Sequence, residues 1–341
     1  MIVQEAIAAI LRGAVLTADE AEAAIDEVMR GDATPAQIAG FAVALALRGE
    51  TAGEVAGCAR AMRRHMTQVQ VGRADAIDNC GTGGDGLGTF NISTTAAFVA
   101  AGAGCAVAKH GNRSASSRCG SAEVLEALGV RLDVAPKTMG RAVDEVGIGF
   151  LYAPLLHGAL RHAAAPRREL GVRTVFNLLG PLANPAGVRR QVVGVARPQH
   201  VQLVAQALRE LGCEHALVLH GAGGADELTL AGPNLVCELR DGEMREFTLD
   251  AEELGLPRAG VDALAGGDAQ ENAALAEGVL SGEPGPRRDA VLLNAAAAIY
   301  VGGAARDLGE GVALARAAID AGRAAERLAG LCALTRREMA V

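Results

Sequence analysis

Residues 78–121, DNCGTGGDGLGTFNISTTAAFVAAGAGCAVAKHGNRSASSRCGS, form the stretch that decides the fold. They contain two polar, glycine-bearing loops, at 81–94 and 109–114, which a helix of small residues joins. Each loop follows a short apolar run, at 76–80 and 105–108, that predicts a strand, and each precedes a helical pattern. Glycine lets the backbone approach a ligand closely, and the free N–H groups of a helix N-terminus attract negative oxygen atoms. The stretch therefore predicts a cradle for an anion.

Downstream of residue 74, strand patterns alternate with helix patterns, which predicts a mostly parallel sheet. Further strands are expected at 148–152, 191–196 and 216–220, and an antiparallel hairpin at 234–250 that turns at Asp241-Gly242. Helices are expected at 122–128, 137–146, 157–170, 199–211, 269–280, 288–300 and 311–331. The segment 174–185 contains a glycine and two prolines and is expected to be irregular.

Residues 1–70 have helical patterns only. Three capping boxes, each a threonine followed three residues later by Glu or Gln, predict helix starts at Thr17, Thr34 and Thr51. This small lobe is too thin to hold a large core alone. Its apolar face is therefore expected to pack on a partner subunit or the next domain, with a simple intramolecular cap as the alternative.

Composition narrows the class of protein. The chain has 341 residues, enough for one large core or two domains. Its net charge of −8 argues against a nucleic-acid binder but allows a locally positive pocket for an anionic small molecule. Its apolar stretches are broken before the roughly 20 residues of a membrane span, and the N-terminal residues lack the features of an export signal. Seven cysteines without CxxC pairs are expected to be reduced, buried thiols of a cytoplasmic protein.

The first loop has three glycines, Asp85 and several hydroxyl groups ahead of a helix. It is not a Walker A motif, because no Gly-Lys-Ser/Thr ends it, and its spacing does not fit GxGxxG. Phosphate binding through backbone amides is one interpretation. The alternative is a plain turn followed by an N-cap at Ser93 or Thr94.

The second loop brings Lys109, His110 and Arg113 within five residues and is rich in serine. It offers a point charge, a guanidinium group and short hydroxyl donors to an anion. A solvated surface loop is the alternative.

Asp226 and Glu227 follow the strand expected at 216–220 on a glycine-rich turn. Adjacent side chains on an extended backbone are expected to diverge, so the pair would hold Mg²⁺ through water together with substrate phosphates. An exposed acid pair is the alternative. Zinc is not expected, because no His or Cys stands beside them in the sequence.

Arg167, Arg168 and Arg173 lie near His157 and His162 in the sequence. On one helix a spacing of five residues places the two histidines about 140° apart, so a shared metal is not expected. An arginine that binds a carboxylate and a solvated basic helix are the two interpretations. No Ser-His-Asp or Cys-His catalytic motif is recognisable.

Four motifs in one order give the chain a resemblance to the anthranilate phosphoribosyltransferase family: GTGGDGLGTFNISTTAA, KHGNRSASSRCGSAEVLEALG, RRELGVRTVFNLLGPLANP and GADELT. The resemblance implies an α/β fold of the nucleoside phosphorylase type, with a small all-helical domain (1–70, joined by helices from about 157–190) and a larger domain (71–341) around a mostly parallel sheet. It implies transfer of the phosphoribosyl group of phosphoribosyl pyrophosphate to the amine of anthranilate in tryptophan biosynthesis. It also implies two Mg²⁺ ions per subunit and a cytoplasmic homodimer formed through the helical domains, with neither nucleic acid nor membrane as a partner.

The same resemblance implies roles for individual residues. Phosphoribosyl pyrophosphate would contact Gly81, Gly84, Asp85, Thr89, Asn91, Ile92, Ser93, Thr94, Lys109, His110, Gly111, Asn112, Arg113, Ser114, Ala115, Ser116, Ser117 and Ser121. Anthranilate would contact Gly81, His110, Asn112 and Arg167. Magnesium would be held by Ser93, Asp226 and Glu227.

Lys109 and Arg113 would neutralise charge on the leaving pyrophosphate, and no general base is expected. Two positions depart from the family pattern, Pro166 and Gly158. Pro166 bears on whether Arg167 or Arg168 faces anthranilate, and we predict that Arg167 does. The alternative functions are a pyrimidine nucleoside phosphorylase and a non-catalytic relative that binds nucleic acid.

Overall fold

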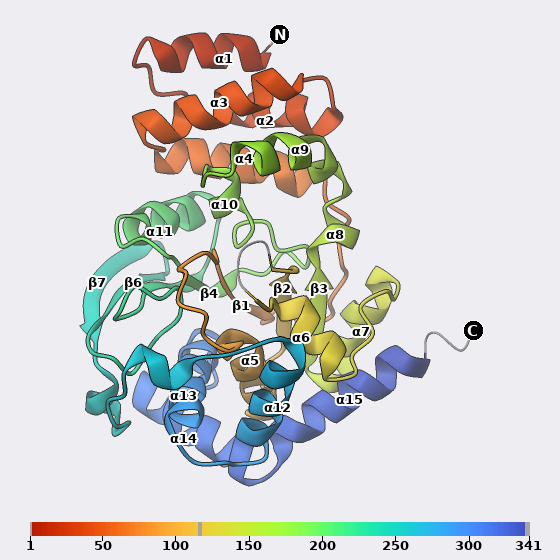
Figure 1. The fold of residues 1–341 in the computed structure, drawn as a ribbon, viewed down its shortest axis with the longest axis vertical. Helices are drawn as coiled ribbons and strands as arrows, with labels where there is room; N and C mark the ends of the chain where they lie inside the picture. Colours follow the sequence, from red (N-terminus) through yellow and green to blue (C-terminus); the bar gives the residue numbers. More distant parts are fainter. Residues whose placement is uncertain (1, 115–117, 338–341) are drawn as a thin grey trace.

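The helical lobe predicted for residues 1–70 is present and forms one end of the molecule (Figure 1). The structure, a computed structural model, describes residues 2–114 and 118–337. The expectations for Ala115, Ser116 and Ser117 lie outside the described residues. The lobe consists of α1 (Ile2–Leu11), α2 (Ala18–Arg30), α3 (Pro35–Arg48) and α4 (Ala52–Arg64).

All three predicted capping boxes are confirmed. Thr17, Thr34 and Thr51 each accept a hydrogen bond from the backbone N–H three residues on, and the Glu or Gln at that position accepts one in return. Two helices from the middle of the chain join the lobe, because α9 (Arg161–Leu170) packs on α2 and α3 and α10 (Phe176–Leu179) packs on α4.

The larger part of the chain is built on a seven-stranded sheet in the order β3-β2-β1-β4-β5-β6-β7. The first five strands in this order are parallel, and the last two pair antiparallel. The strands are β1 (Ile77–Gly81), β2 (Val107–Gly111), β3 (Ile148–Tyr152), β4 (Arg190–Gly194), β5 (His215–His220), β6 (Asn234–Arg240) and β7 (Glu243–Leu249). The fold class predicted from the sequence is therefore confirmed.

Alternate residues of the central strands enter two different cores, because successive side chains of a strand point to opposite faces. Val192 and Leu217 pack with α5 and α13 in one core. Val193 and Val218 pack with α11 and the helical lobe in the other. Burial on both faces explains why these strands are continuous apolar runs.

The remaining helices cover the sheet or its ends (Figure 1). They are α5 (Ile92–Gly102), α6 (Ser121–Ala127), α7 (Pro136–Val146), α8 (Ala153–Leu156), α11 (His200–Glu210), α12 (Ala269–Leu280), α13 (Pro286–Val301), α14 (Leu308–Asp320) and α15 (Arg323–Arg337), with short 3₁₀ turns η1 (Gly158–Leu160), η2 (Ala251–Leu254) and η3 (Val261–Leu264). No helix among residues 2–114 and 118–337 combines the length and apolar character needed to cross a membrane.

Three boundaries differ from the prediction. The helix expected at 311–331 is two helices, α14 and α15, separated at Gly322, whose φ of 73° is a conformation that favours glycine. The helix expected at 157–170 is broken, and His157 stands between α8 and η1. Strand β2 extends to Gly111, so Lys109 and His110 belong to the strand and not to the loop.

The predicted hairpin is confirmed as β6 and β7. Its turn residues Asp241 and Gly242 have φ values of 52° and 85°, the positive pair that a type I′ turn requires.

Candidate functional site

The site lies where the strand order of the parallel sheet reverses. Strand β1 has β2 on one side and β4 on the other, and Gly81 and Gly194 are register partners at the carboxyl ends of β1 and β4. In open α/β sheets, the crevice at such a reversal is where ligands bind. The loop after β1 and the turn after β5 meet at this point, because Gly83 N–H donates to Asp226 Oδ2 over 2.6 Å.

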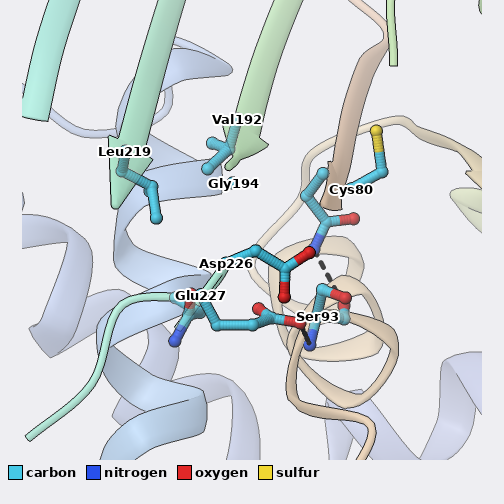
Figure 2. Close-up of a pocket in the computed structure, with 9 residues that line it drawn as sticks. Cys80, Ser93, Val192, Gly194, Leu219, Asp226 and Glu227 are labelled. Carbon is cyan, nitrogen blue, oxygen red and sulfur yellow. Dashed lines mark hydrogen bonds between the residues drawn. The ribbon is translucent and has the colours of Figure 1, made fainter. Parts of the chain in front are cut away.

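The acid pair is fixed by backbone donors from the first loop. Asp226 accepts from Gly83, and Glu227 Oε1 accepts from the N–H of Ser93 at 3.2 Å. Ser93 is in the first turn of α5, where free N–H groups and the helix dipole favour a carboxylate. Both acids line one small pocket with Ser93, and Figure 2 shows the two carboxylates extending toward Ser93. The expectation that adjacent side chains diverge is wrong here, because the turn after β5 is not extended.

Two glycines make room for Asp226. A methyl group built on Gly81 would overlap Asp226 Oδ2, and one built on Gly194 would overlap the backbone oxygen of Asp226. Any side chain at either position would displace the acid turn. Gly81 was predicted to contact substrates directly, whereas its evident structural role is this close approach.

Burial disfavours the ionised form of both acids. Burial, the neighbouring Glu227 and then Asp85 raise the pKa of Asp226 to about 8. Burial also raises the pKa of Glu227, against the lowering effect of Lys109 and of the hydrogen bonds from Ser93. The pocket is therefore built to receive positive charge.

The donor set fits magnesium better than a softer metal. Among the described residues, no cluster of three or more His, Cys, Asp or Glu side chains is arranged to hold a metal. The pocket instead offers two carboxylates and the Ser93 hydroxyl, all hard oxygen donors. Magnesium is commonly held by one or two carboxylates plus substrate phosphates. The residues present fit an ion whose coordination the substrate completes.

Lys109 is almost fully buried and contacts Asn79, one of the residues that line the pocket. Its ammonium group donates to the backbone oxygen of Asn79. Burial raises the pKa of both Asp78 and Glu227, and the charge of Lys109 opposes that rise. Asp78 in turn accepts from His110 N–H at 3.0 Å and from Asn184 Nδ2 at 2.8 Å. Lys109 thus balances part of the buried negative charge and ties β1 to β2.

The second loop folds back on the start of α6. Asn112 Oδ1 accepts from the N–H of Arg113, and the Asn112 backbone oxygen accepts from the Ser121 hydroxyl at 3.1 Å. Ser114 N–H donates to Glu123. The Arg113 guanidinium contacts Glu126 at 2.7 Å and the Tyr152 hydroxyl at 2.9 Å. In this conformation Arg113 is paired with an acid of the chain.

The remaining predicted residues of the first loop surround the acid pair or anchor the loop. Asp85 accepts from the N–H groups of Leu87 and Asp226, at 3.1 and 3.4 Å. Asn91 is the N-cap of α5, so the alternative cap at Ser93 or Thr94 is wrong. Ile92 and Thr94 are buried in α5. Thr89 forms a bridge to Ala265 that holds the end of the loop.

Arg173 braces the first loop, and sequence reasoning did not single it out for this role. Its Nη1 donates to the Gly83 oxygen at 2.5 Å and its Nη2 to the Thr82 oxygen at 3.4 Å. A methyl group on Gly84 would overlap the same guanidinium. The TVFN motif that follows Arg173 was noted in the sequence, but nothing local indicated that the arginine reaches back across 90 residues.

His110 and His157 form a buried pair that the sequence did not indicate. Their Nε2 atoms are 3.1 Å apart, and His110 Nδ1 lies 3.0 Å from the Gly180 oxygen. Burial lowers the pKa of His110 to about 3, with His157 adding to the effect, and burial lowers the pKa of His157 to about 4. Both rings are neutral at pH 7. Because His110 Nδ1 faces a carbonyl oxygen, it donates to Gly180, and His110 Nε2 accepts from His157, so the ring supplies no charge to an anion.

The two neighbouring arginines of α9 have different environments. The Arg167 guanidinium stacks over Phe176, with its Cζ 5.4 Å from the ring centroid, and burial lowers its pKa. It forms no ion pair with a described residue. Arg168 is exposed. Arg167 is thus the partly buried cation of the two, and its contact with anthranilate stays a prediction.

Family models match both parts of the chain. Residues 4–66 match the helical bundle domain of a glycosyl transferase family, and residues 73–325 match its a/b domain.

Individual relatives are similar to this chain, in sequence or in structure, along nearly its whole length. The anthranilate phosphoribosyltransferase of Chloroflexus aggregans is 55% identical over 99% of this chain and 100% of its own length. The crystal structure of the Thermus thermophilus enzyme superposes with a TM-score of 0.93 at 50% identity, covering 97% of this chain and 99% of that one. The Saccharomyces cerevisiae enzyme, solved in complex with PRPP and Mg, gives a TM-score of 0.89 at 26% identity and 98% coverage of both chains.

Proposed function

The chain belongs to the anthranilate phosphoribosyltransferase family, and from this premise we propose how its own residues carry out the reaction of that family. The reaction transfers the phosphoribosyl group of phosphoribosyl pyrophosphate to the amine of anthranilate, a step of tryptophan biosynthesis. The observation that carries the proposal is the meeting of the first predicted glycine loop with the half-buried pair Asp226 and Glu227 at the strand reversal.

Phosphoribosyl pyrophosphate lies across the two loops in this proposal. Its phosphate oxygens face the backbone N–H groups of the first loop and the start of α5, where a helix N-terminus favours anions. The sugar phosphate and pyrophosphate are polyanions, so Lys109 on β2 and Arg113 of the second loop contribute positive charge, once Arg113 leaves Glu126 for the substrate. Ser93, Asp226 and Glu227 would hold magnesium, and we propose two ions per subunit.

Anthranilate lies on the side of the sheet that faces α9. Arg167 neutralises its carboxylate, and Gly81, Asn112 and the neutral ring of His110 complete the subsite. An aryl amine is already a neutral nucleophile at pH 7, so the site requires no general base. The amine nitrogen attacks C1 of the ribose, the bond from C1 to the pyrophosphate oxygen breaks with its electron pair, and the ammonium product loses its proton to solvent.

The chain contributes mainly position and charge to this step. Holding two reactants in line can supply up to about 7–11 kcal/mol of the barrier. Bound magnesium supplies positive charge to the pyrophosphate oxygens as they leave. Lys109 limits the cost of burying Asp78 and Glu227 beside that charge.

The two alternative functions are not favoured. A pyrimidine nucleoside phosphorylase or a nucleic-acid-binding relative would not be expected to combine the acid pair with an arginine on α9 that has no acidic partner in the described part of the chain. The similar proteins are anthranilate phosphoribosyltransferases. The reduced cysteines, most of them buried, suit our proposal of a cytoplasmic enzyme.

The proposed function has a direct test. The purified protein should consume anthranilate, followed by loss of its fluorescence, only when both phosphoribosyl pyrophosphate and Mg²⁺ are present. Chelation of the metal should stop the reaction, and added Mg²⁺ should restore it. Full activity in excess chelator would overturn the magnesium assignment, and phosphorolysis of uridine without transfer to anthranilate would favour the phosphorylase.

We also propose that residues 1–70 with α9 and α10 form one helical domain and that two copies dimerise through it. Several large apolar side chains on α1, α3 and the turn after α1 are exposed, with Leu47 86% and Leu11 73% accessible. These helices form the end of the lobe that points away from the sheet (Figure 1). A patch of this kind is typical of a protein interface.

Replacing Leu47 by Asp should convert the dimer to a monomer in light scattering, because a buried, unpaired carboxylate opposes association. Val172→Asp is the matched control, since Val172 is an exposed apolar side chain that lies on neither α1 nor α3. A wild-type protein that is monomeric at micromolar concentration, or a Leu47→Asp dimer of unchanged affinity, would contradict the proposal.

A further inference from the structure

Two neighbouring peptide groups of the first loop are held by Arg173, which comes from the segment between α9 and α10. The guanidinium donates from Nη1 to the Gly83 oxygen at 2.5 Å and from Nη2 to the Thr82 oxygen at 3.4 Å. Gly83 N–H donates in turn to Asp226 Oδ2 at 2.6 Å. This part of the loop is therefore fixed by a cation at its carbonyl groups and by a carboxyl group at an N–H group.

These contacts determine the direction of the next N–H group. No peptide bond between described residues is cis, and in a trans peptide group the N–H points away from the C=O. The group that joins Thr82 to Gly83 follows this rule, because its oxygen contacts Arg173 and its N–H contacts Asp226. The group that joins Gly83 to Gly84 also turns its oxygen to Arg173. The N–H of Gly84 must therefore point away from the guanidinium.

The N–H of Gly84 is a free donor that a ligand can reach. It donates to no residue in the described part of the chain, and Gly84 is exposed. Gly83 and Gly84 have φ values of 66° and 76°, a conformation that glycine adopts without strain. Backbone N–H groups presented by a turn of this kind commonly bind anions such as phosphate.

The guanidinium of Arg173 suits this task for two reasons. Its rigid fork can hold two neighbouring carbonyl oxygens at once. Its positive charge also polarises the peptide group that it contacts, which makes the N–H at the other end a stronger donor. Two successive glycines would otherwise leave the loop with many conformations, because glycine restricts the backbone least. Arg173 forms no ion pair with a described acid, so its known contacts are those with the loop.

We propose that Arg173 is a positioning residue for phosphoribosyl pyrophosphate: by holding the oxygens of Thr82 and Gly83, it directs the N–H of Gly84 to a phosphate oxygen of the substrate. The inference rests on the proposed function, which places this substrate across the first loop. Arg173 acts through the loop and does not itself contact the substrate. Its loss therefore weakens substrate binding by releasing a backbone donor from its direction.

The test observes the N–H of Gly84 directly by nuclear magnetic resonance. The protein is labelled with ¹³C at the carbonyl and ¹⁵N at the amide of glycine only. An experiment that correlates each amide with the preceding carbonyl carbon then shows only Gly-Gly pairs, which in this chain are 83–84, 223–224, 266–267 and 302–303. The signal of Gly84 is the one that is absent in Gly84→Ala.

Wild type, Arg173→Met and Arg197→Met are titrated with phosphoribosyl pyrophosphate and Mg²⁺ in the absence of anthranilate. Methionine keeps the unbranched stem of arginine and removes the guanidinium. Arg197 is the matched control, because it is an exposed arginine whose side chain bonds to no described residue. It lies near Arg173, since burial lowers the pKa of Arg173 and the charge of Arg197 adds to the effect.

The Gly84 amide proton of wild type should move downfield as the substrate saturates the protein, because an N–H that donates to an anion is deshielded. Arg173→Met should raise the dissociation constant of the substrate about tenfold or more, the size of one hydrogen bond to a charged group. Its Gly84 proton should move less than that of wild type at saturation. Arg197→Met should stay within about threefold of wild type, as expected for an exposed charge.

Three results would overturn the inference. The first is a Gly84 proton of wild type that does not move although the substrate binds, and this result decides the question even if Arg173→Met melts early. The second is an Arg173→Met protein that binds weakly but shows the full shift of Gly84 at saturation, because Arg173 would then contact the substrate itself. The third is an equal loss of affinity in Arg173→Met and Arg197→Met, which would indicate a general effect of charge. A wild-type protein that binds no phosphoribosyl pyrophosphate would instead overturn the proposed function, and the inference with it.

Discussion

The double variant Asp226→Asn, Glu227→Gln should lower kcat/KM by about 10³-fold, because a metal clamp on a leaving phosphoryl group supplies several kcal/mol of charge stabilisation. The amides retain the shape of the acids and can still accept from Gly83 and Ser93. The loss should appear in the fluorescence assay at saturating Mg²⁺. The matched control is Glu252→Gln, Glu253→Gln, an adjacent acid pair that is exposed on η2, and its activity should equal that of wild type.

The same double variant should be more stable than wild type without metal, which distinguishes a site built for a cation from a damaged fold. The pKa of Asp226 is raised to about 8 in the folded chain, above its ordinary value of 3.8. A carboxyl whose pKa is raised by folding contributes stability below its unfolded pKa, and this contribution is lost as pH rises through the folded value. Metal-free wild type should therefore lose stability between about pH 4 and pH 8, whereas the amide variant should lose less.

Thermal unfolding at pH 5 and pH 8, with and without Mg²⁺ and phosphoribosyl pyrophosphate, measures this difference. The ligands should restore stability to wild type at pH 8 and should not do so for the double variant. A double variant that melts earlier than wild type at pH 8 in the absence of metal would show that the acids support the fold, and the site assignment would then fail.

Arg167→Gln should raise KM for anthranilate by about 100-fold and leave KM for phosphoribosyl pyrophosphate nearly unchanged, because a charge-assisted hydrogen bond to a carboxylate is worth about 1.5–3 kcal/mol. Arg167 is partly buried against Phe176 and makes no ion pair with a described residue, so its charge is available to a ligand. Initial rates against each substrate in turn measure the two constants.

Arg168→Gln is the matched control, since it removes the same charge from the next position of α9, where the side chain is exposed. It should change neither constant more than about twofold, as expected for an exposed charge. An equal rise in the KM for anthranilate in the two variants would indicate a general effect of charge. A rise confined to Arg168→Gln would show that Arg168, and not Arg167, binds anthranilate.

Local structure and the chemical type of the site were predictable from the sequence. The capping boxes at Thr17, Thr34 and Thr51 determine where three helices begin, and the Asp241-Gly242 pair determines a hairpin turn. These features depend on residues a few positions apart, which the sequence displays directly. The two glycine loops and the acid pair were likewise recognisable as candidate parts of an anion and metal site, which stays a prediction.

Only the tertiary structure decided how these parts meet. The strand order places Gly81 beside Gly194, and the turn after β5 then brings Glu227 to Ser93 across 134 residues. The pairing of His110 with His157 across 47 residues arises in the same way. Such contacts depend on which strands become neighbours, which is determined by the packing of the whole sheet and not by any local pattern. The sequence therefore indicated which residues form the site, and the order of the strands determined how these residues lie relative to one another.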